Sequence, residues 1–86
     1  MHRDRILVVD DDENMVYIIK DALQHEGYEV STAGDGATGI QLVSIKHPDL
    51  VIADVMMPGM DGFSMLESIR RIGYNMPVLI LTARTD

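Results

Sequence analysis

Three short apolar runs constrain the fold of this chain more than any other feature. They occupy residues 6–9, 50–53 and 78–81, and apolar side chains do not alternate with polar ones within them. Such runs are typical of strands buried on both faces, and these strands occur in parallel sheets that helices cover on both sides. We therefore expect an α/β protein built on a parallel sheet.

Helical patterns and one weaker strand separate these runs. Residues 13–26 predict a helix that ends at Gly27, because glycine suits the left-handed cap position. Residues 29–33 alternate weakly and predict a shorter strand. A poorer helix, weakened by Gly39, is expected to end near Pro48. The pattern places Val16, Ile19 and Leu23 on one face of the first helix, and the second helix is indicated by Ala37, Ile40 and Val43.

A third helix is predicted over residues 62–72, with Asp61 as its N-cap and Gly73 as its stop. Its predicted buried residues are Phe63, Leu66 and Ile69. This alternation of strand and helix favours a doubly wound, flavodoxin-like sheet with right-handed crossovers and strand order 2-1-3-4.

In this fold the ligand site lies beyond the carboxyl ends of the first and third strands. The first strand runs directly into Asp10, Asp11, Asp12 and Glu13, and the third ends in Asp54. We expect an acidic pocket there, in which like charges oppose folding unless a cation intervenes. Oxygen ligands without cysteine suit Mg²⁺ better than Zn²⁺. The histidines, interpreted as surface residues, are His2, His25 and His47.

Several motifs in a fixed order carry a family resemblance that covers essentially the whole chain. They are Ile6-Leu7-Val8-Val9-Asp10-Asp11, Asp54, Met57-Pro58, Met60-Asp61-Gly62 and Leu81-Thr82-Ala83. Together they resemble the receiver domain of two-component response regulators. Residues 1–86 are accordingly interpreted as one receiver domain.

The resemblance implies a role for each matching residue. Asp54 matches the phosphoacceptor, which takes a phosphoryl group from a sensor histidine kinase or a histidine phosphotransfer protein. Asp11 matches a direct Mg²⁺ ligand and Asp10 one that acts largely through water, while Asp54 and the backbone carbonyl of Met56 complete the protein's share. Thr82 matches the hydroxyl that binds the phosphoryl group and switches the conformation. Such a domain is a signalling phosphoacceptor rather than an enzyme, although family members assist their own phosphorylation and dephosphorylation.

Other residues near the motifs have structural interpretations. Asp12 and Glu13 are expected to complement the helix dipole, and Asp61 to cap a helix. Two interpretations stay open for a group of three methionines: they pack in the core, or they form an adaptable docking surface. This group consists of Met56, Met57 and Met60.

The chain also departs from the family pattern. A receiver also has a fifth strand that ends in a lysine, and further helices. Residues 1–86 leave no room for these elements, so the chain is interpreted as a C-terminally truncated receiver. Lys20 and Lys46 are not expected to reach the pocket, and Arg84 is the only basic side chain near it in sequence. Residues 78–81 would then form the edge strand of the sheet. They contain no charged residue or proline to prevent pairing with another strand, which predicts a homodimer through this strand or the adjoining helical face.

Three other functions compete with that of a receiver. A phosphohydrolase of the haloacid dehalogenase kind would need threonine or valine where Asn14 stands, and a flavin module would need a hydroxyl-rich loop where four acids stand. A phosphorylation-impaired fragment that acts only in interaction or dimerisation is the serious alternative. Net charge −7 argues against direct nucleic-acid binding. The absence of cysteine and of an apolar stretch near ~18 residues predicts a cytoplasmic protein without membrane contact.

Overall fold

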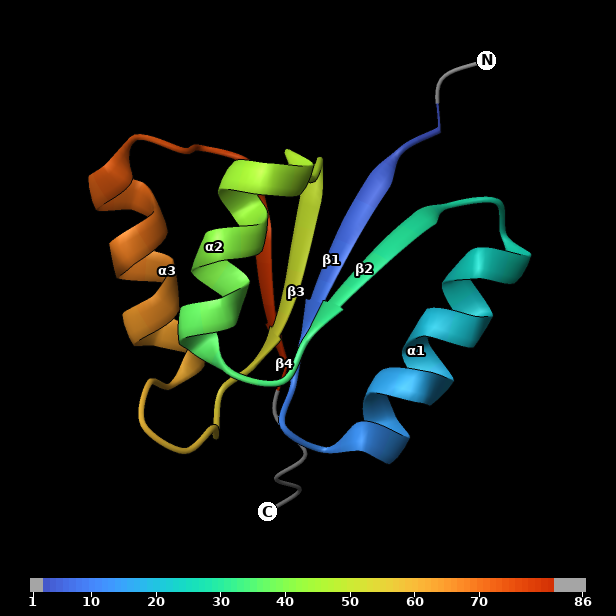
Figure 1. Cartoon of the computed structure of the whole chain (residues 1–86), viewed down its shortest axis with the longest axis horizontal. Coiled ribbons are helices and arrows are strands. Elements are labelled where there is room, and N and C mark those ends of the chain that lie inside the picture. The colour runs from blue at the N-terminus through green and yellow to red at the C-terminus, as the bar shows by residue number, and fades with distance from the viewer. Residues whose placement is uncertain (1–2, 82–86) are drawn as a thin grey trace.

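A computed structural model gives the structure of the chain and describes residues 3–81. Strands and helices alternate along these residues, as Figure 1 shows. The strands are β1 (Arg5–Val9), β2 (Glu29–Ala33), β3 (Leu50–Asp54) and β4 (Val78–Leu81). The helices are α1 (Glu13–His25), α2 (Gly36–Lys46) and α3 (Gly62–Ile72). The predicted elements are confirmed, with small differences at their ends.

The four strands form one parallel sheet in the predicted order β2-β1-β3-β4. In the register, Val9 at the end of β1 lies opposite Ala33 of β2 and Ala53 of β3. The carboxyl ends of β1 and β3 therefore reach the same edge of the sheet side by side. This arrangement is the flavodoxin-like fold, and its switch point lies between these two strands.

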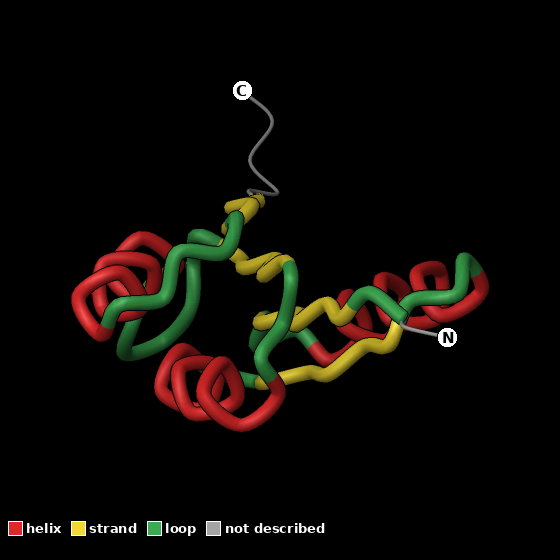
Figure 2. Tube along the Cα trace, turned by 90° about the horizontal axis from the view of Figure 1, so that it is seen from above, coloured by secondary structure: helices red, strands yellow, loops and turns green. Residues whose placement is uncertain are grey.

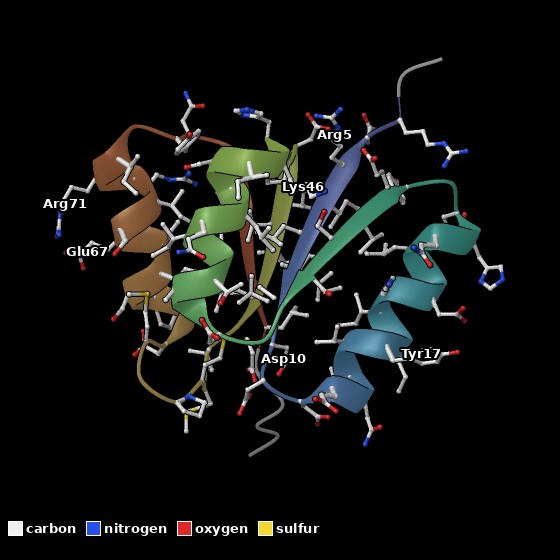
Figure 3. All side chains as sticks on the ribbon, viewed as in Figure 1. Arg5, Asp10, Tyr17, Lys46, Glu67 and Arg71 are labelled. Carbon is white, nitrogen blue, oxygen red and sulfur yellow. The ribbon has the colours of Figure 1, made fainter. Side chains whose placement is uncertain are left out.

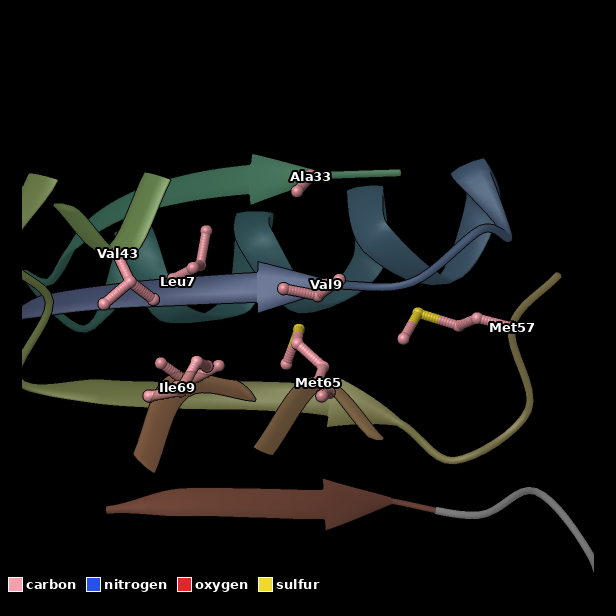
Figure 4. Packing of buried hydrophobic residues seen from close by; sticks show 9 residues of the cluster. Leu7, Val9, Ala33, Val43, Met57, Met65 and Ile69 are labelled. Carbon is pink, nitrogen blue, oxygen red and sulfur yellow. The ribbon is translucent and has the colours of Figure 1, made fainter. Parts of the chain in front are cut away.

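Helices cover both faces of the sheet. Because side chains alternate along a strand, β1 sends Leu7 and Val9 to one face and Ile6 and Val8 to the other. Helices α2 and α3 pack over the first face, where Figure 4 shows part of the core. Helix α1 packs against β1 and β2 on the other face, apart from α2 and α3 in Figure 2.

The predicted helix ends agree with the structure. Gly27 and Gly73 have φ angles of 96° and 115°, which residues other than glycine rarely adopt. The Asp61 carboxylate caps α3 by accepting a hydrogen bond from the Ser64 amide, with 2.7 Å between N and O. His47 is the C-cap of α2, and its left-handed φ of 51° turns the chain just before Pro48.

The predicted buried face of α3 is wrong at one position. Phe63 is 60% exposed, whereas Met65 and Ile69 have no exposed surface. The helix turns the face of Gly62, Met65 and Ile69 toward the core. Leu66 is only partly buried. The physical reason is the close approach of Gly62 to β3, which fixes the rotation of the helix.

Arg5 ties the elements together at the amino-terminal ends of the strands. Its Nε donates to the Glu29 carboxylate at 2.9 Å, and its Nη1 donates to the Lys46 carbonyl at 3.2 Å. Its backbone amide donates to the Asp49 carboxylate at 2.8 Å. Figure 3 shows Arg5 and Lys46 at one end of the sheet and Asp10 at the other. Lys46 therefore lies at the opposite end of the sheet from Asp10, as the sequence predicts.

Candidate functional site

Three carboxylates meet at the carboxyl edge of the sheet. Asp10 and Asp11 directly follow β1, and Asp54 is the last residue of β3. Each offers one oxygen atom, and these three atoms lie within 4.8 Å of one another. Asp10 is buried at 9% exposure, Asp54 is partly buried and Asp11 is exposed. The structure thus brings together the three acids that the sequence singled out, while their roles stay predictions.

Backbone amides fix the orientation of two of these side chains. The Asp12 amide donates to Oδ1 of Asp10 at 2.9 Å, and the Met56 amide lies 3.4 Å from Oδ1 of Asp54. The Asp12 carboxylate instead caps α1, because it accepts from the amides of Asn14 and Met15. Asp12 is therefore the N-cap of α1, which is consistent with the structural role expected of it.

The electrostatics of the cluster disfavour charge on Asp10. Burial raises the pKa of its carboxyl above the ordinary value, and the negative charges of Asp54, Asp11 and Asp12 raise it further. The hydrogen bond from the Asp12 backbone amide acts in the opposite direction. A bound divalent cation would relieve this repulsion. The donor set consists of oxygen atoms alone, so it fits Mg²⁺.

The loop between β3 and α3 decides between the two interpretations for two of its three methionines. Met57 belongs to the core at 8% exposure, and Met60 packs against that core. Met56 is 66% exposed and extends into solvent beside the acids. Core packing thus explains two of the three side chains. The Met56 carbonyl as a metal ligand stays a prediction.

The remaining candidates have different outcomes. Thr82 and Arg84 lie outside the described residues. Lys20 lines a hollow of about 450 Å³ that Asp10 and Asp11 also line. No ion pair joins it to either acid within residues 3–81. The sequence does not reveal this shared hollow, because the helical period predicts the face on which a side chain lies but not how far it reaches toward the first turn of the helix.

A second hollow, also missed, lies on the α1 face of the sheet. Its volume is about 260 Å³, and it lies between α1 and β4 next to Asp10 and Asp54. Its apolar lining is Val8, Val9, Met15, Ile19, Ile52 and Leu81. Within residues 3–81, α1 is the only helix that packs on this face, and it packs against β1 and β2, which leaves β4 uncovered there.

The fold and the site define a class of protein. A flavodoxin-like sheet with three carboxylates at its switch point is the arrangement of the receiver domains that the motifs resemble. The family model of the response regulator receiver domain matches residues 6–86. The chain therefore belongs to the response regulator receiver family of two-component signalling, which is a signalling family rather than a family of classical enzymes.

Individual relatives agree with this assignment. The chain is similar to the response regulator MprA of Mycobacterium sp. (strain KMS), with 42% identity over 80 residues that make up 93% of this chain and 35% of the relative. It is also similar to the alkaline phosphatase synthesis transcriptional regulatory protein PhoP of Bacillus subtilis (strain 168), with 38% identity over 95% of this chain and 34% of the relative. The chain thus spans about a third of the length of these curated relatives.

Solved structures show the same fold. The chemotaxis protein CheY4 of Vibrio cholerae superposes with a TM-score of 0.93 at 33% identity, over 99% of this chain and 72% of that one. Within residues 3–81, no helix is long and apolar enough to cross a membrane. The expected cytoplasmic location stays a prediction.

Proposed function

We propose that this chain accepts a phosphoryl group on Asp54 and acts as the receiver of a phosphorelay. The observation that carries the proposal is the meeting of Asp10, Asp11 and Asp54 within 4.8 Å at the switch point of the sheet. Membership of the receiver family supports it. Asp54 ends a buried strand, so its carboxylate is held by the sheet yet reachable from solvent.

The proposed step is a transfer between two covalent bonds. A carboxylate oxygen of Asp54 attacks the phosphorus of a phosphohistidine, and the bond between phosphorus and the histidine nitrogen breaks. The nitrogen leaves with the electron pair and takes up a proton. The product is an aspartyl phosphate. The Met56 amide, near Oδ1, orients the Asp54 carboxylate for the attack.

Asp10, Asp11, Asp54 and the Met56 carbonyl would hold Mg²⁺ in this site. The ion would supply positive charge that offsets the negative charge of the carboxylates and of the incoming phosphoryl oxygens. Asp10 contributes a partly desolvated charge, and its orientation is set by the Asp12 amide. Asp11 is exposed, so it can meet a hydrated ion without rearrangement of the core.

The phosphodonor proposed for this chain is a sensor histidine kinase or a histidine phosphotransfer protein, which would meet it in the cytoplasm. In the proposed cycle, the Thr82 hydroxyl binds the phosphoryl group and carries the change to a partner surface. These roles rest on the residues that match the family motifs. The relatives named above are transcriptional or response regulators by their own descriptions.

Intact-mass measurement after incubation with acetyl phosphate and Mg²⁺ tests the proposal. We expect one added phosphoryl group, which the variant Asp54→Asn does not acquire. The matched control is Asp12→Asn, which removes a nearby charge while asparagine keeps the helix cap. It should retain most of the incorporation. Phosphoryl mass that persists in Asp54→Asn would remove Asp54 from this role.

A second candidate function is a module that acts through self-association alone. The supporting observation is that Leu79 and Leu81 on β4 are 50% and 41% exposed. Within residues 3–81, β4 is an edge strand that pairs only with β3. A second copy of the chain, joined through this edge, would bury both side chains. A chain that forms dimers and takes up no phosphoryl group would favour this candidate.

A further inference from the structure

Gly62, the first residue of α3, lies against the backbone of Asp54. A Cβ atom added at this position would lie 2.5 Å from the Asp54 carbonyl oxygen and 3.2 Å from the Asp54 carbonyl carbon. It would also lie 3.3 Å from the Cα of Val55. All three neighbours are backbone atoms, so no flexible side chain can move aside. Gly62 is therefore required for space, in contrast to Gly59, whose φ of 82° requires glycine for its conformation.

The same residue closes the loop that follows Asp54. The Gly62 amide donates a hydrogen bond to the Val55 carbonyl at 3.2 Å. The Val55 amide donates in turn to the Leu81 carbonyl at 2.9 Å, which holds the start of the loop on β4. Met56 is the next residue, and its amide lies near the Asp54 carboxylate. The backbone on either side of the Asp54 side chain is thus fixed by the contact with Gly62.

Helix α3 cannot easily retreat from this contact. Met65 and Ile69 are completely buried, and they hold α3 in the core. Helix α3 also packs closely on α2, because a Cβ added at Gly39 would lie 3.0 Å from the Met65 sulfur. A side chain at position 62 would therefore displace the Asp54–Val55 peptide rather than the helix.

We propose that Gly62 is a positioning residue that sets where the Asp54 carboxylate lies relative to Asp10 and Asp11. This inference rests on the proposed phosphoacceptor role of Asp54. A nonbonded carbon and a carbonyl oxygen approach to roughly 3.3 Å, so an added methyl group must move the peptide by about 0.8 Å. A misplacement of this order in a group-transfer site costs roughly 10- to 100-fold in rate.

The experiment compares Gly62→Ala with two control variants. Gly34→Ala adds the same methyl group where no atom lies within 4 Å. Ile69→Val removes a buried methyl group from the same helix, and so reports what lost stability alone does to the rate. The rate of phosphoryl incorporation from acetyl phosphate is measured for each at saturating Mg²⁺, beside its thermal midpoint. We expect a 10- to 100-fold lower rate for Gly62→Ala and rates near that of the unmodified chain for both controls.

A second measurement needs neither metal nor phosphodonor. In the ¹⁵N spectrum of the metal-free protein, Gly62→Ala should shift the amide signals of Val55 and Met56, and Gly34→Ala should leave them in place. If Gly62→Ala is unstable, sucrose is added to all samples, since excluded osmolytes favour the folded state.

The two readouts separate the two proposals. An unmodified chain that takes up no phosphoryl group refutes the proposed function, and the amide signals then decide the inference about Gly62. Unshifted Val55 and Met56 signals overturn that inference. A normal rate in Gly62→Ala, or an equal loss of rate in Ile69→Val, overturns it as well.

Discussion

Neutralising one carboxylate of the acid cluster should stabilise the metal-free protein. The variant is Asp10→Asn, which keeps an oxygen acceptor for the Asp12 amide and removes the most buried charge of the cluster. At 4.8 Å, two unit charges repel by about 1 kcal/mol in water and by about 3.5 kcal/mol at an effective dielectric constant of 20. Because Asp11 is exposed and Asp54 partly buried, we expect a total gain of roughly 2 kcal/mol for Asp10→Asn.

This gain should be visible in thermal melts. For a domain of this size, 1 kcal/mol shifts the midpoint by about 4–8 °C, so Asp10→Asn should melt roughly 10 °C higher in buffer with a chelator. Mg²⁺ should reverse the order. At one hundred times its dissociation constant, an ion stabilises the unmodified chain by about 2.7 kcal/mol, which exceeds the gain of roughly 2 kcal/mol expected for Asp10→Asn, and the variant should gain much less from the ion.

The control is Asp4→Asn, which makes the same change in net charge at the exposed start of the chain, before β1. At physiological salt the Debye length is about 8 Å, so this variant should melt close to the unmodified chain. An Asp10→Asn variant that melts at or below the unmodified chain in chelator would refute the reasoning from repulsion. Equal Mg²⁺ stabilisation of both chains would refute the assignment of the metal site.

Three further predictions concern the fold. Met65→Ala should lower the free energy of unfolding by roughly 2–5 kcal/mol in urea titration, whereas Phe63→Ala should cost less than about 1 kcal/mol; equal costs would contradict the observed face of α3. Backbone amides in the first turns of α2 and α3 hold the pKa of the Asp35 and Asp61 carboxyl groups below the ordinary value of 3.8. Both helix caps therefore stabilise the fold above that pH, and they lose this effect as the pH falls through their pKa in the folded protein. Acid titration should show a smaller loss in Asp61→Asn than in the unmodified chain. If β4 joins two copies, light scattering at several concentrations should detect dimers that Leu79→Lys abolishes; a monomer at every concentration would reject this interface.

The sequence predicts three of the four strands because each of them is an apolar run of its own, and the strand order follows from the flavodoxin-like topology. It also predicts the meeting of Asp10 with Asp54, since parallel strands in this order must end side by side. Both inferences depend on local patterns and on a general rule of topology. They need no knowledge of how any particular side chain packs.

The rotation of α3 could not be predicted in the same way. Apolar residues lie on two overlapping faces of this helix, one with Phe63 and the other with Met65, and both include Ile69. The choice between them depends on Gly62, which must face β3 because only glycine fits against the Asp54 carbonyl. The helical periodicity of apolar residues cannot reveal this choice, because it does not detect a position at which the lack of a side chain determines the packing.

The segments that carry the site residues differ in the free energy needed to open their backbone locally. Asp10 and Asp11 follow β1, which pairs with a strand on each side and is buried on both faces. Amides of such a strand exchange with solvent chiefly through global unfolding, whereas loops open at much lower free energy. Met56 belongs to the loop between β3 and α3, which lies at the surface. Asp10 should therefore keep its place for as long as the sheet stays folded, whereas the exposed tip of the loop at Pro58 and Gly59, beyond the residues held by Gly62 and β4, should open at lower free energy.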